Sequence, residues 1–348
     1  MRITFGPWGE TLAEVADAAR AAEEAGAEVN WVPELHRSAT VSAAVVAQAT
    51  RTAQVGTAVA LAFTRSPMIT ALEALDLDEL SGGRLVLGLG TGVQRLNEDW
   101  HHVDWAKPAT HLRETVRNIR AFWATCTSGE PIDLDGEREP MRIRGYQRPY
   151  AVTRTDIPVY VAAMGPLMTR LAGEIGDGWI SHELTSPAFL RDRILPELDG
   201  GLERGGRPRT ALDVVTSTCV SVDADPAVAR RRSAGMVGFY ASVRTYADFF
   251  AFHDLAAEQE AVVEAFRGGR GAGTLADAVA DRMVDALTLS GTRDRVVERV
   301  AAYGEVADSI KLTPPTHGLT PAEIRVAQKE VIALIAELTG LSQMGGRR

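Results

Sequence analysis

The chain has 348 residues, of which 45% are hydrophobic and 24% charged, and its formal net charge is −9. This composition is typical of a globular protein, and the acidic balance argues against nucleic-acid binding, which needs clustered positive charge. Two cysteines form no disulfide framework, and no cysteine–histidine cluster predicts a metal site. We find no signal-peptide pattern and no apolar run of about 18 residues, so we expect a cytoplasmic protein with no membrane partner.

Strand and helix patterns alternate along the whole chain. In order we predict the strand Arg2–Phe5, the helix Thr11–Ala25, the strand Val29–Val32, the helix Val41–Thr50, the strand Val55–Leu61, the helix Pro67–Leu80, the strand Leu85–Leu89 and a helix from about Leu112 to Ala124. The second half continues with the strand Pro158–Ala162, the helix Pro166–Ile175, the strand Trp179–Ser181, a helix near Pro187, a strand within Ala211–Val222, a helix after Pro226, the strand Asp308–Leu312 and a final helix from Thr320.

Five helix starts share one local signal, a capping residue followed by proline. The pairs are Ser66-Pro67, Gly165-Pro166, Ser186-Pro187, Asp225-Pro226 and Thr320-Pro321. Proline is favoured at the first helical position because its missing N–H would have no partner there. These signals mark where helices begin.

The alternation predicts an α/β protein with the (β/α)8 TIM-barrel fold, as a single domain over residues 1–348. Two stretches interrupt it. Residues 129–150 are polar and rich in glycine, proline and arginine, which predicts an inserted loop or hairpin. Residues 236–288 are helical in composition, which predicts a helical insertion between the seventh and eighth strands.

In this fold the functional residues follow the strands, and several such loops carry candidate groups. Glu34 and His36 follow the second strand, and His182 follows the sixth, so all three are candidates for acid–base chemistry. A solvated loop and a structural histidine are the alternatives. Gly88, Gly90 and Gly92 would let a ligand approach the backbone closely. The turn at Gly165 presents a helix N-terminus, which predicts either an anion site or a simple glycine cap.

Several motifs give the chain a family resemblance. They are Trp31-Val-Pro-Glu34, Gly56-Thr-Ala-Val59, Ser66-Pro67, Ser81-Gly-Gly-Arg-Leu-Val-Leu-Gly-Leu-Gly-Thr-Gly92, Lys107-Pro108, Leu112-Arg-Glu114, Pro158-Val-Tyr-Val-Ala-Ala163, Gly165-Pro166, Gly176-Asp-Gly-Trp179 and Ser290-Gly-Thr292. With these motifs the chain resembles the luciferase-like superfamily of flavin- and F420-dependent barrel enzymes, and within it the F420-dependent oxidoreductases. The resemblance covers nearly the whole barrel.

The resemblance implies a cofactor site. A non-proline cis peptide would fall at Ala58-Val59, behind the cofactor ring. Thr91, Gly92 and Asn97 match positions near the ring. The segment Met164, Gly165, Pro166 and Leu167 matches the one whose backbone N–H groups bind the cofactor phosphate.

The chain also departs from its relatives. The family's glucose-6-phosphate dehydrogenases have Asp-His after the second strand and a glutamate after Gly-Thr-Gly, where this chain has Glu34-Leu35 and Val93. We therefore do not expect that substrate, and His36 is a hypothetical replacement for the shifted histidine.

The resemblance implies an F420-dependent oxidoreductase that transfers a hydride to or from a small organic substrate, as a reductase of a C=C, C=N or C=O bond. An FMN-dependent monooxygenase and a non-catalytic flavin-binding protein are the alternatives. The resemblance further implies a homodimer.

Overall fold

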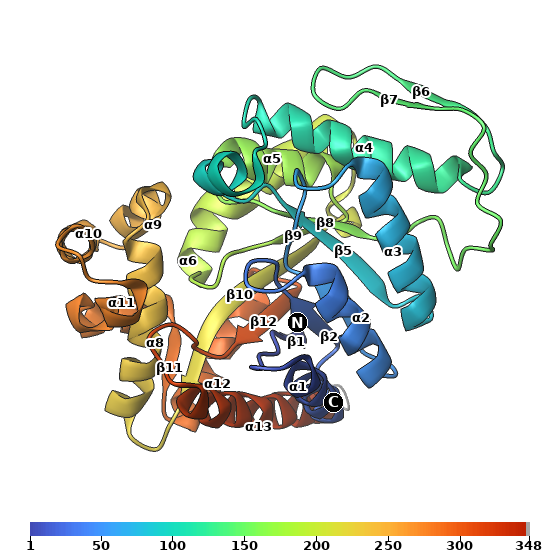
Figure 1. Cartoon of the computed structure of the whole chain (residues 1–348). Helices are drawn as coiled ribbons and strands as arrows, with labels where there is room; N and C mark the ends of the chain where they lie inside the picture. The colour runs from blue at the N-terminus through green and yellow to red at the C-terminus, as the bar shows by residue number, and fades with distance from the viewer. Residues whose placement is uncertain (346–348) are drawn as a thin grey trace. The chain divides into compact units, whose positions relative to one another are not determined.

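The computed structural model of the chain describes residues 1–345, and parallel strands form its central sheet (Figure 1). The strand order is β11-β10-β12-β1-β2-β3-β5-β8-β9, and β9 also pairs with β10, so the sheet closes on itself. The pairs β1–β12, β2–β3, β3–β5, β5–β8, β8–β9 and β10–β12 are all parallel. The predicted (β/α)8-barrel fold is therefore confirmed. The strands are β1 (Arg2–Phe5), β2 (Val29–Val32), β3 (Gln54–Thr57), β4 (Ala60–Leu61), β5 (Leu85–Gly90), β8 (Val159–Ala162), β9 (Gly178–Ile180), β10 (Asp213–Val222), β11 (Leu289–Gly291) and β12 (Ser309–Thr313).

Helices alternate with these strands, and the proline signals identify their starts correctly. All five predicted pairs lie at helix N-termini, and Ser66 and Ser186 accept backbone N–H groups as caps. The helix predicted from about Leu112 begins about one turn earlier, at Pro108, although the preceding Lys107 makes no side-chain cap. The helices that follow barrel strands are α1 (Leu12–Glu24), α2 (Ala39–Ala49), α3 (Pro67–Ser81), α4 (Pro108–Thr125), α5 (Pro166–Ile175), α6 (Pro187–Phe189), α7 (Leu195–Gly205), α8 (Pro226–Ala241), α12 (Arg293–Ala301) and α13 (Pro321–Gly345).

The chain divides into two compact units, which are described separately below. The first consists of residues 1–28, 181–195 and 214–348, and the second of residues 29–180 and 196–213. The expectation of a single domain stays a prediction. Over residues 1–345, no helix is both long and apolar enough to cross a membrane.

In the second unit, the insertion at 129–150 contains the antiparallel hairpin β6 (Ile132–Leu134) and β7 (Met141–Ile143), which lies beside α4 (Figure 1). Glu114 of α4 accepts hydrogen bonds from the backbone N–H groups of Glu137, Arg138 and Glu139, at 2.9, 2.8 and 2.7 Å. His111 of the same helix contacts the Glu139 carboxylate at 2.7 Å. These contacts attach the predicted insertion to the barrel helix that precedes it.

In the first unit, the insertion predicted at 236–288 is helical and has its own core. It comprises the end of α8 followed by α9 (Ala247–Phe252), α10 (Ala256–Arg267) and α11 (Asp281–Leu287), with short 3-10 turns between them. Phe249, Phe250, Leu255, Leu275 and Met283 are among its buried residues. These helices lie around α8 in Figure 1, and together with α8 they enclose this buried cluster.

One strand prediction needs correction, and one further strand was not predicted. The expected strand Val55–Leu61 is two strands, β3 and β4, because the backbone turns at Ala58-Val59 and pairing with β5 resumes at Ala60. The short strand β11, at the end of the helical insertion, was not predicted; it pairs with β10 in parallel. Three residues give too short a pattern to be recognised from sequence.

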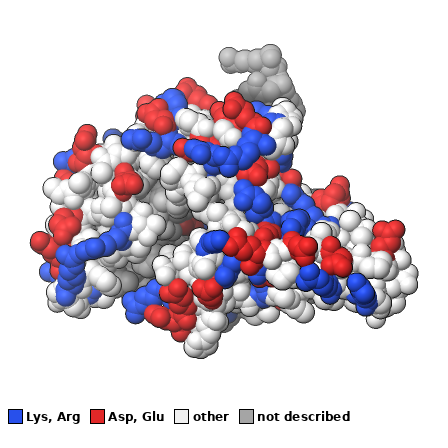
Figure 2. Space-filling model, turned by 90° about the horizontal axis from the view of Figure 1, so that it is seen from above, with Lys and Arg blue, Asp and Glu red and all other residues white. Residues whose placement is uncertain are grey.

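On the face drawn in Figure 2, basic and acidic side chains are interspersed.

Candidate functional site

The ends of three neighbouring strands of the second unit meet at Gly90. A β-carbon built on Gly90 would lie 2.5 Å from the Val59 Cγ2 and 3.6 Å from the Ala162 Cβ. Val59 follows β3, Gly90 ends β5 and Ala162 ends β8. Glycine at this position therefore allows the three strand ends to pack closely, and it brings together the loops in which cofactor-binding residues were predicted.

The backbone between β3 and β4 has the expected unusual peptide. The bond Ala58-Val59 is cis, at the position that the family resemblance implied. The Ala58 N–H donates to the Val32 carbonyl at 2.8 Å, and the Val59 carbonyl accepts from the Glu34 N–H at 3.1 Å. Ala58 and Val59 are both partly exposed, so the segment is held by β2 and remains accessible.

The turn after β5 is organised by Asn97. Its side-chain Nδ2 donates to the carbonyls of Thr91 and Val93, at 2.7 and 3.0 Å. Gly92 between them has φ +67°, a left-handed conformation that glycine adopts readily. Asn97 is fully buried, and its Oδ1 has no hydrogen-bond partner within the part of the chain that the structure describes. A buried acceptor without a partner is costly, so a ligand N–H at this position would remove that cost.

The turn between β8 and α5 contains Met164, Gly165, Pro166 and Leu167. Gly165 is the N-cap of α5, no side chain caps the helix, and a β-carbon on Gly165 would meet no atom within 4 Å. The carbonyl of Ala163, just before this turn, accepts the Trp179 indole N–H at 3.0 Å. An open, positioned helix N-terminus of this kind favours an anion. The assignment of this segment to a phosphate stays a prediction.

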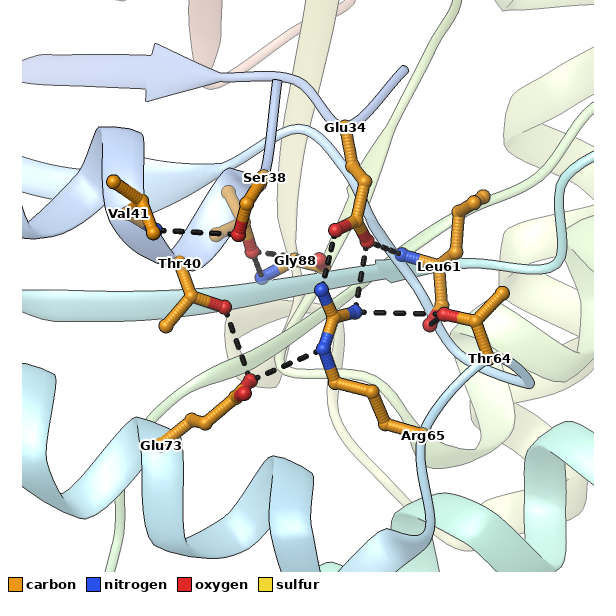
Figure 3. A network of polar contacts seen from close by, with 10 residues as sticks. Glu34, Ser38, Thr40, Val41, Leu61, Thr64, Arg65, Glu73 and Gly88 are labelled. Atoms are coloured by element: carbon orange, nitrogen blue, oxygen red, sulfur yellow. Dashed lines mark hydrogen bonds and ion pairs between the residues drawn. The ribbon is translucent and has the colours of Figure 1, made fainter. Parts of the chain in front are cut away.

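Glu34 forms an ion pair that sequence analysis did not identify (Figure 3). Both carboxylate oxygens contact the Arg65 guanidinium, Oε2 at 2.9 Å, and Oε2 also accepts the Leu61 N–H at 2.8 Å. Arg65 contacts Glu73 at 3.3 Å as well. Burial raises the pKa of Glu34, but the hydrogen bonds from Arg65 and Leu61 lower it overall. Glu34 is therefore held as a carboxylate, which suits positioning of the β2 and β4 loops better than proton donation.

His36, the second acid–base candidate, lies two residues further along the same loop and is exposed. No hydrogen bond or ion pair connects it to Glu34 among the described residues. The structure therefore gathers Ala58, Val59, Gly92 and Asn97 with Glu34, while His36 stays outside this group.

His182, in the first unit, has a different environment. Its Nδ1 accepts the Leu184 N–H at 3.2 Å, and its ring lies 5.2 Å from Tyr240 and 5.0 Å from Tyr246. Burial lowers the pKa of His182 to about 3, against the opposing effect of the Glu183 charge. His182 is therefore a neutral imidazole near pH 7 and offers Nε2–H as a hydrogen-bond donor.

Sequence analysis missed the charged group beside His182. Glu183 Oε1 contacts Lys311 Nζ at 2.9 Å, and Oε2 accepts the Tyr240 hydroxyl at 2.6 Å. Burial raises the pKa of Glu183, but the Lys311 charge and the two hydrogen bonds lower it to about 2. One signal was available: Lys311 is a charged residue inside a buried strand, and a buried lysine requires a partner.

Over residues 1–345, no group of three or more histidine, cysteine, aspartate or glutamate side chains could hold a metal ion. Both cysteines are buried, and burial raises their thiol pKa values.

Known proteins are similar to this chain in sequence and in fold. The sequence model of a family described as luciferase-like monooxygenase matches residues 3–309. A 5,10-methylenetetrahydromethanopterin reductase of Archaeoglobus fulgidus is 32% identical over 285 residues, which cover 80% of this chain and 82% of the relative. Both matches extend over most of the barrel.

Solved structures agree with the fold. The coenzyme F420-dependent tetrahydromethanopterin reductase of Methanopyrus kandleri aligns with a TM-score of 0.81 and 23% identity, over 97% of this chain and 98% of that one. An F420-dependent secondary alcohol dehydrogenase, solved with an F420–acetone adduct, aligns with a TM-score of 0.71 and 18% identity, over 96% of this chain and 99% of that one.

Proposed function

The chain belongs to the luciferase-like monooxygenase family, and from this premise we propose that it is an F420-dependent oxidoreductase that reduces a C=C, C=N or C=O bond of a small organic substrate. The relatives support F420, because a solved reductase and a solved dehydrogenase of this fold are both F420-dependent by name. The single observation that carries the proposal is the buried, unpartnered Asn97 Oδ1 beside the left-handed turn at Gly92.

These residues fit a flat ring with a phosphate-bearing tail. The partly exposed Val59, which packs against Gly90, would lie against the ring, and Asn97 Oδ1 would accept an N–H of the ring. Gly165 and Leu167 would hold the phosphate with backbone N–H groups at the start of α5. The same fit extends to FMN, which keeps an FMN-dependent monooxygenase as the second candidate.

Bound F420 in its reduced form would supply a hydride to one atom of the substrate double bond, while the other atom takes up a proton. Glu34 is paired with Arg65 and serves to hold the β2 and β4 loops. His182 in the first unit stays neutral, so it can donate a hydrogen bond from Nε2 but does not supply a proton. His36 is exposed and remains a candidate for passing a proton from solvent.

Titration with F420 and with FMN, followed by fluorescence, tests the cofactor. We expect saturable binding of F420 and weaker binding of FMN. Oxidation of reduced F420 by a panel of enones, imines and ketones then tests hydride transfer. Tight FMN binding without any response to F420 would overturn the proposal in favour of the monooxygenase. Binding of F420 without transfer to any acceptor would favour a non-catalytic flavin-binding protein.

The phosphate position has its own variant. Gly165→Asp adds a helix cap, which tends to stabilise α5, but its carboxylate occupies the N–H groups and repels a phosphate. We expect at least tenfold weaker F420 binding with an unchanged or raised Tm. Gly200→Asp is the matched control in α7, where the added Cβ would lie 3.8 Å from Arg170 Nε; its F420 binding should stay at the wild-type level. Equal binding by both variants would remove Gly165 from the site.

A further inference from the structure

Five partly exposed rings of the first unit contact one another in a connected group, which we call the aromatic wall: His182, Phe239, Tyr240, Tyr246 and His317. The ring centroids lie 4.5 Å apart for Phe239 and His317, 5.3 Å for Phe239 and Tyr240, and 4.9 Å for Tyr240 and Tyr246. His182 contacts both tyrosines. His182 follows β9 and His317 follows β12, so the wall includes residues from the loops in which this fold carries its functional groups.

The aromatic wall is backed by ordered core. Tyr240 and Tyr246 pack against the buried cluster of the helical insertion, which includes Val237 and Leu255. The His182 ring meets the edge of the buried Phe249 at 5.1 Å. Rings fixed in this way lose little conformational freedom when a planar molecule stacks on them, which favours binding.

The charges beneath the wall cancel. Glu183 and Lys311 form one ion pair, and the Tyr240 hydroxyl donates to Glu183. Burial keeps His182 neutral, and it raises the pKa of both tyrosines, so neither is ionised near pH 7. A charged group placed on this surface would lose hydration without gaining an opposite charge.

Two polar atoms of the wall remain available. His182 accepts a backbone N–H at Nδ1, so the neutral ring carries its proton on Nε2, and this N–H has no partner among the described residues. The Tyr246 hydroxyl likewise makes no hydrogen bond within that part of the chain. Donors on an otherwise apolar surface select ligands that carry an acceptor.

We propose that the aromatic wall binds the substrate of this enzyme, and that this substrate is an uncharged, planar, conjugated molecule with a carbonyl or imine acceptor facing His182 Nε2. The inference rests on the proposed function, whose substrate it specifies. The Phe239 and His317 rings, tilted by 34° to each other, stack on the conjugated plane. Tyr240 meets Phe239 and Tyr246 edge to face, at 82° and 90°, so the tyrosines border that plane, and the neutral Glu183–Lys311 pair keeps the Tyr240 ring in place.

The test compares chromone with chromone-2-carboxylate, which share one ring system and differ by a charge. Equilibrium dialysis against the full chain measures both without any cofactor. We expect chromone to bind at least tenfold more tightly. Phe239→Ala and His182→Ala should each weaken chromone binding at least fivefold, while His182→Gln, which keeps an N–H donor, should recover part of the loss. Phe266→Ala is the matched control, because Phe266 is 48% exposed on α10 and is not part of the wall.

Each outcome bears on the inference. Equal or tighter binding of the carboxylate overturns the neutral substrate, and chromone binding that survives both Phe239→Ala and His182→Ala overturns the location. If Phe239→Ala does not fold, Phe239→Leu preserves much of the apolar volume and still removes the ring. F420 titration of the same proteins separates the two claims: chromone binding without F420 binding contradicts only the proposed function, and the reverse contradicts only the substrate assignment.

Discussion

Val59 lies directly against Gly90, so closely that a β-carbon built on Gly90 would come within 2.5 Å of the Val59 Cγ2 atom. Two carbon atoms that are not bonded to each other do not approach this closely. Either β5 or the Val59 segment must therefore move when residue 90 gains a side chain. The position of Val59 beside the predicted cofactor site thus depends on glycine at position 90.

Gly90→Ala should destabilise the protein by about 1–3 kcal/mol, because the added methyl group overpacks a closed site. F420 binding should weaken at least tenfold, since the surface beside Val59 is displaced. Urea unfolding and F420 fluorescence measure the two effects. Gly340→Ala is the matched control: its β-carbon would meet nothing within 4 Å, and alanine in a helix should stabilise by about 0.5–1 kcal/mol. Normal stability and F420 binding in Gly90→Ala would contradict the close packing.

The ion pair between Glu34 and Arg65 leads to a second prediction. Their side chains are 12% and 19% exposed, so Arg65→Met leaves a largely buried carboxylate without its main partner. We expect a loss of about 1–3 kcal/mol in the free energy of unfolding. Arg95→Met removes a similar pair whose arginine is 85% exposed, and it should cost less than about 0.5 kcal/mol.

The same pair gives a pH dependence. The folded state lowers the pKa of Glu34, so its stabilising contribution is complete above the unfolded pKa and is lost as the pH falls through the folded pKa. The difference in unfolding free energy between the wild type and Glu34→Gln should therefore shrink as the solution is acidified. A difference that grows on acidification would show that Glu34 is not held as a carboxylate.

Much of the fold could be predicted from local sequence patterns. Proline after a capping residue located five helix starts, since both residues act within one turn. The glycines of β5 were expected to let a ligand approach the backbone, whereas in the structure Thr57 O and the Val59 side chain take the space beside Gly88 and Gly90. The position of the cis peptide came from the family resemblance, because composition alone gives no such signal.

The partners of the candidate residues could not be predicted, because they are distant in the chain. Arg65 meets Glu34 across 31 positions, and Lys311 meets Glu183 across 128. Only the fold decides which charge a loop carboxylate will face. For the same reason Glu34 and His182 were both candidates for proton transfer, whereas their surroundings hold one as a carboxylate and the other as a neutral ring.

His182 should show its neutral state directly. With a folded pKa of about 3, its imidazole resonance in NMR spectra should not titrate between pH 5 and 8, and its nitrogen shifts should report a proton on Nε2. Comparison with His182→Gln assigns the resonance. A midpoint near the ordinary value of about 6.5 would contradict the effect of burial.

Stability should follow the same titration. The folded pKa of His182 lies below the unfolded one, so folding favours the neutral ring. The resulting contribution is complete above about pH 6.5 and is lost progressively as the pH falls toward 3. The wild type should therefore lose more stability than His182→Gln over this range, as measured by urea unfolding at several pH values.

The last prediction concerns the insertion at 129–150. The Glu114 carboxylate accepts three successive N–H groups, those of Glu137, Arg138 and Glu139, and it is only 9% exposed. Glu114→Gln replaces one acceptor oxygen by an NH₂ group that faces backbone donors. Two of the three hydrogen bonds depend on Oε2 and one on Oε1, so either orientation of the amide loses at least one bond and brings two donors together.

We expect Glu114→Gln to cost about 1–3 kcal/mol, mainly as local opening of the segment between β6 and β7. Hydrogen exchange should speed up at residues 137–139, while the barrel strands keep most of their protection. Arg144→Gln is the control on the same insertion, because it removes only an exposed contact with Asp133 at 3.4 Å. Equal exchange at residues 137–139 in the two variants would show that Glu114 does not hold the insertion. The insertion would then be attached by His111 and Asn118, which contact the side chain and the carbonyl of Glu139, respectively.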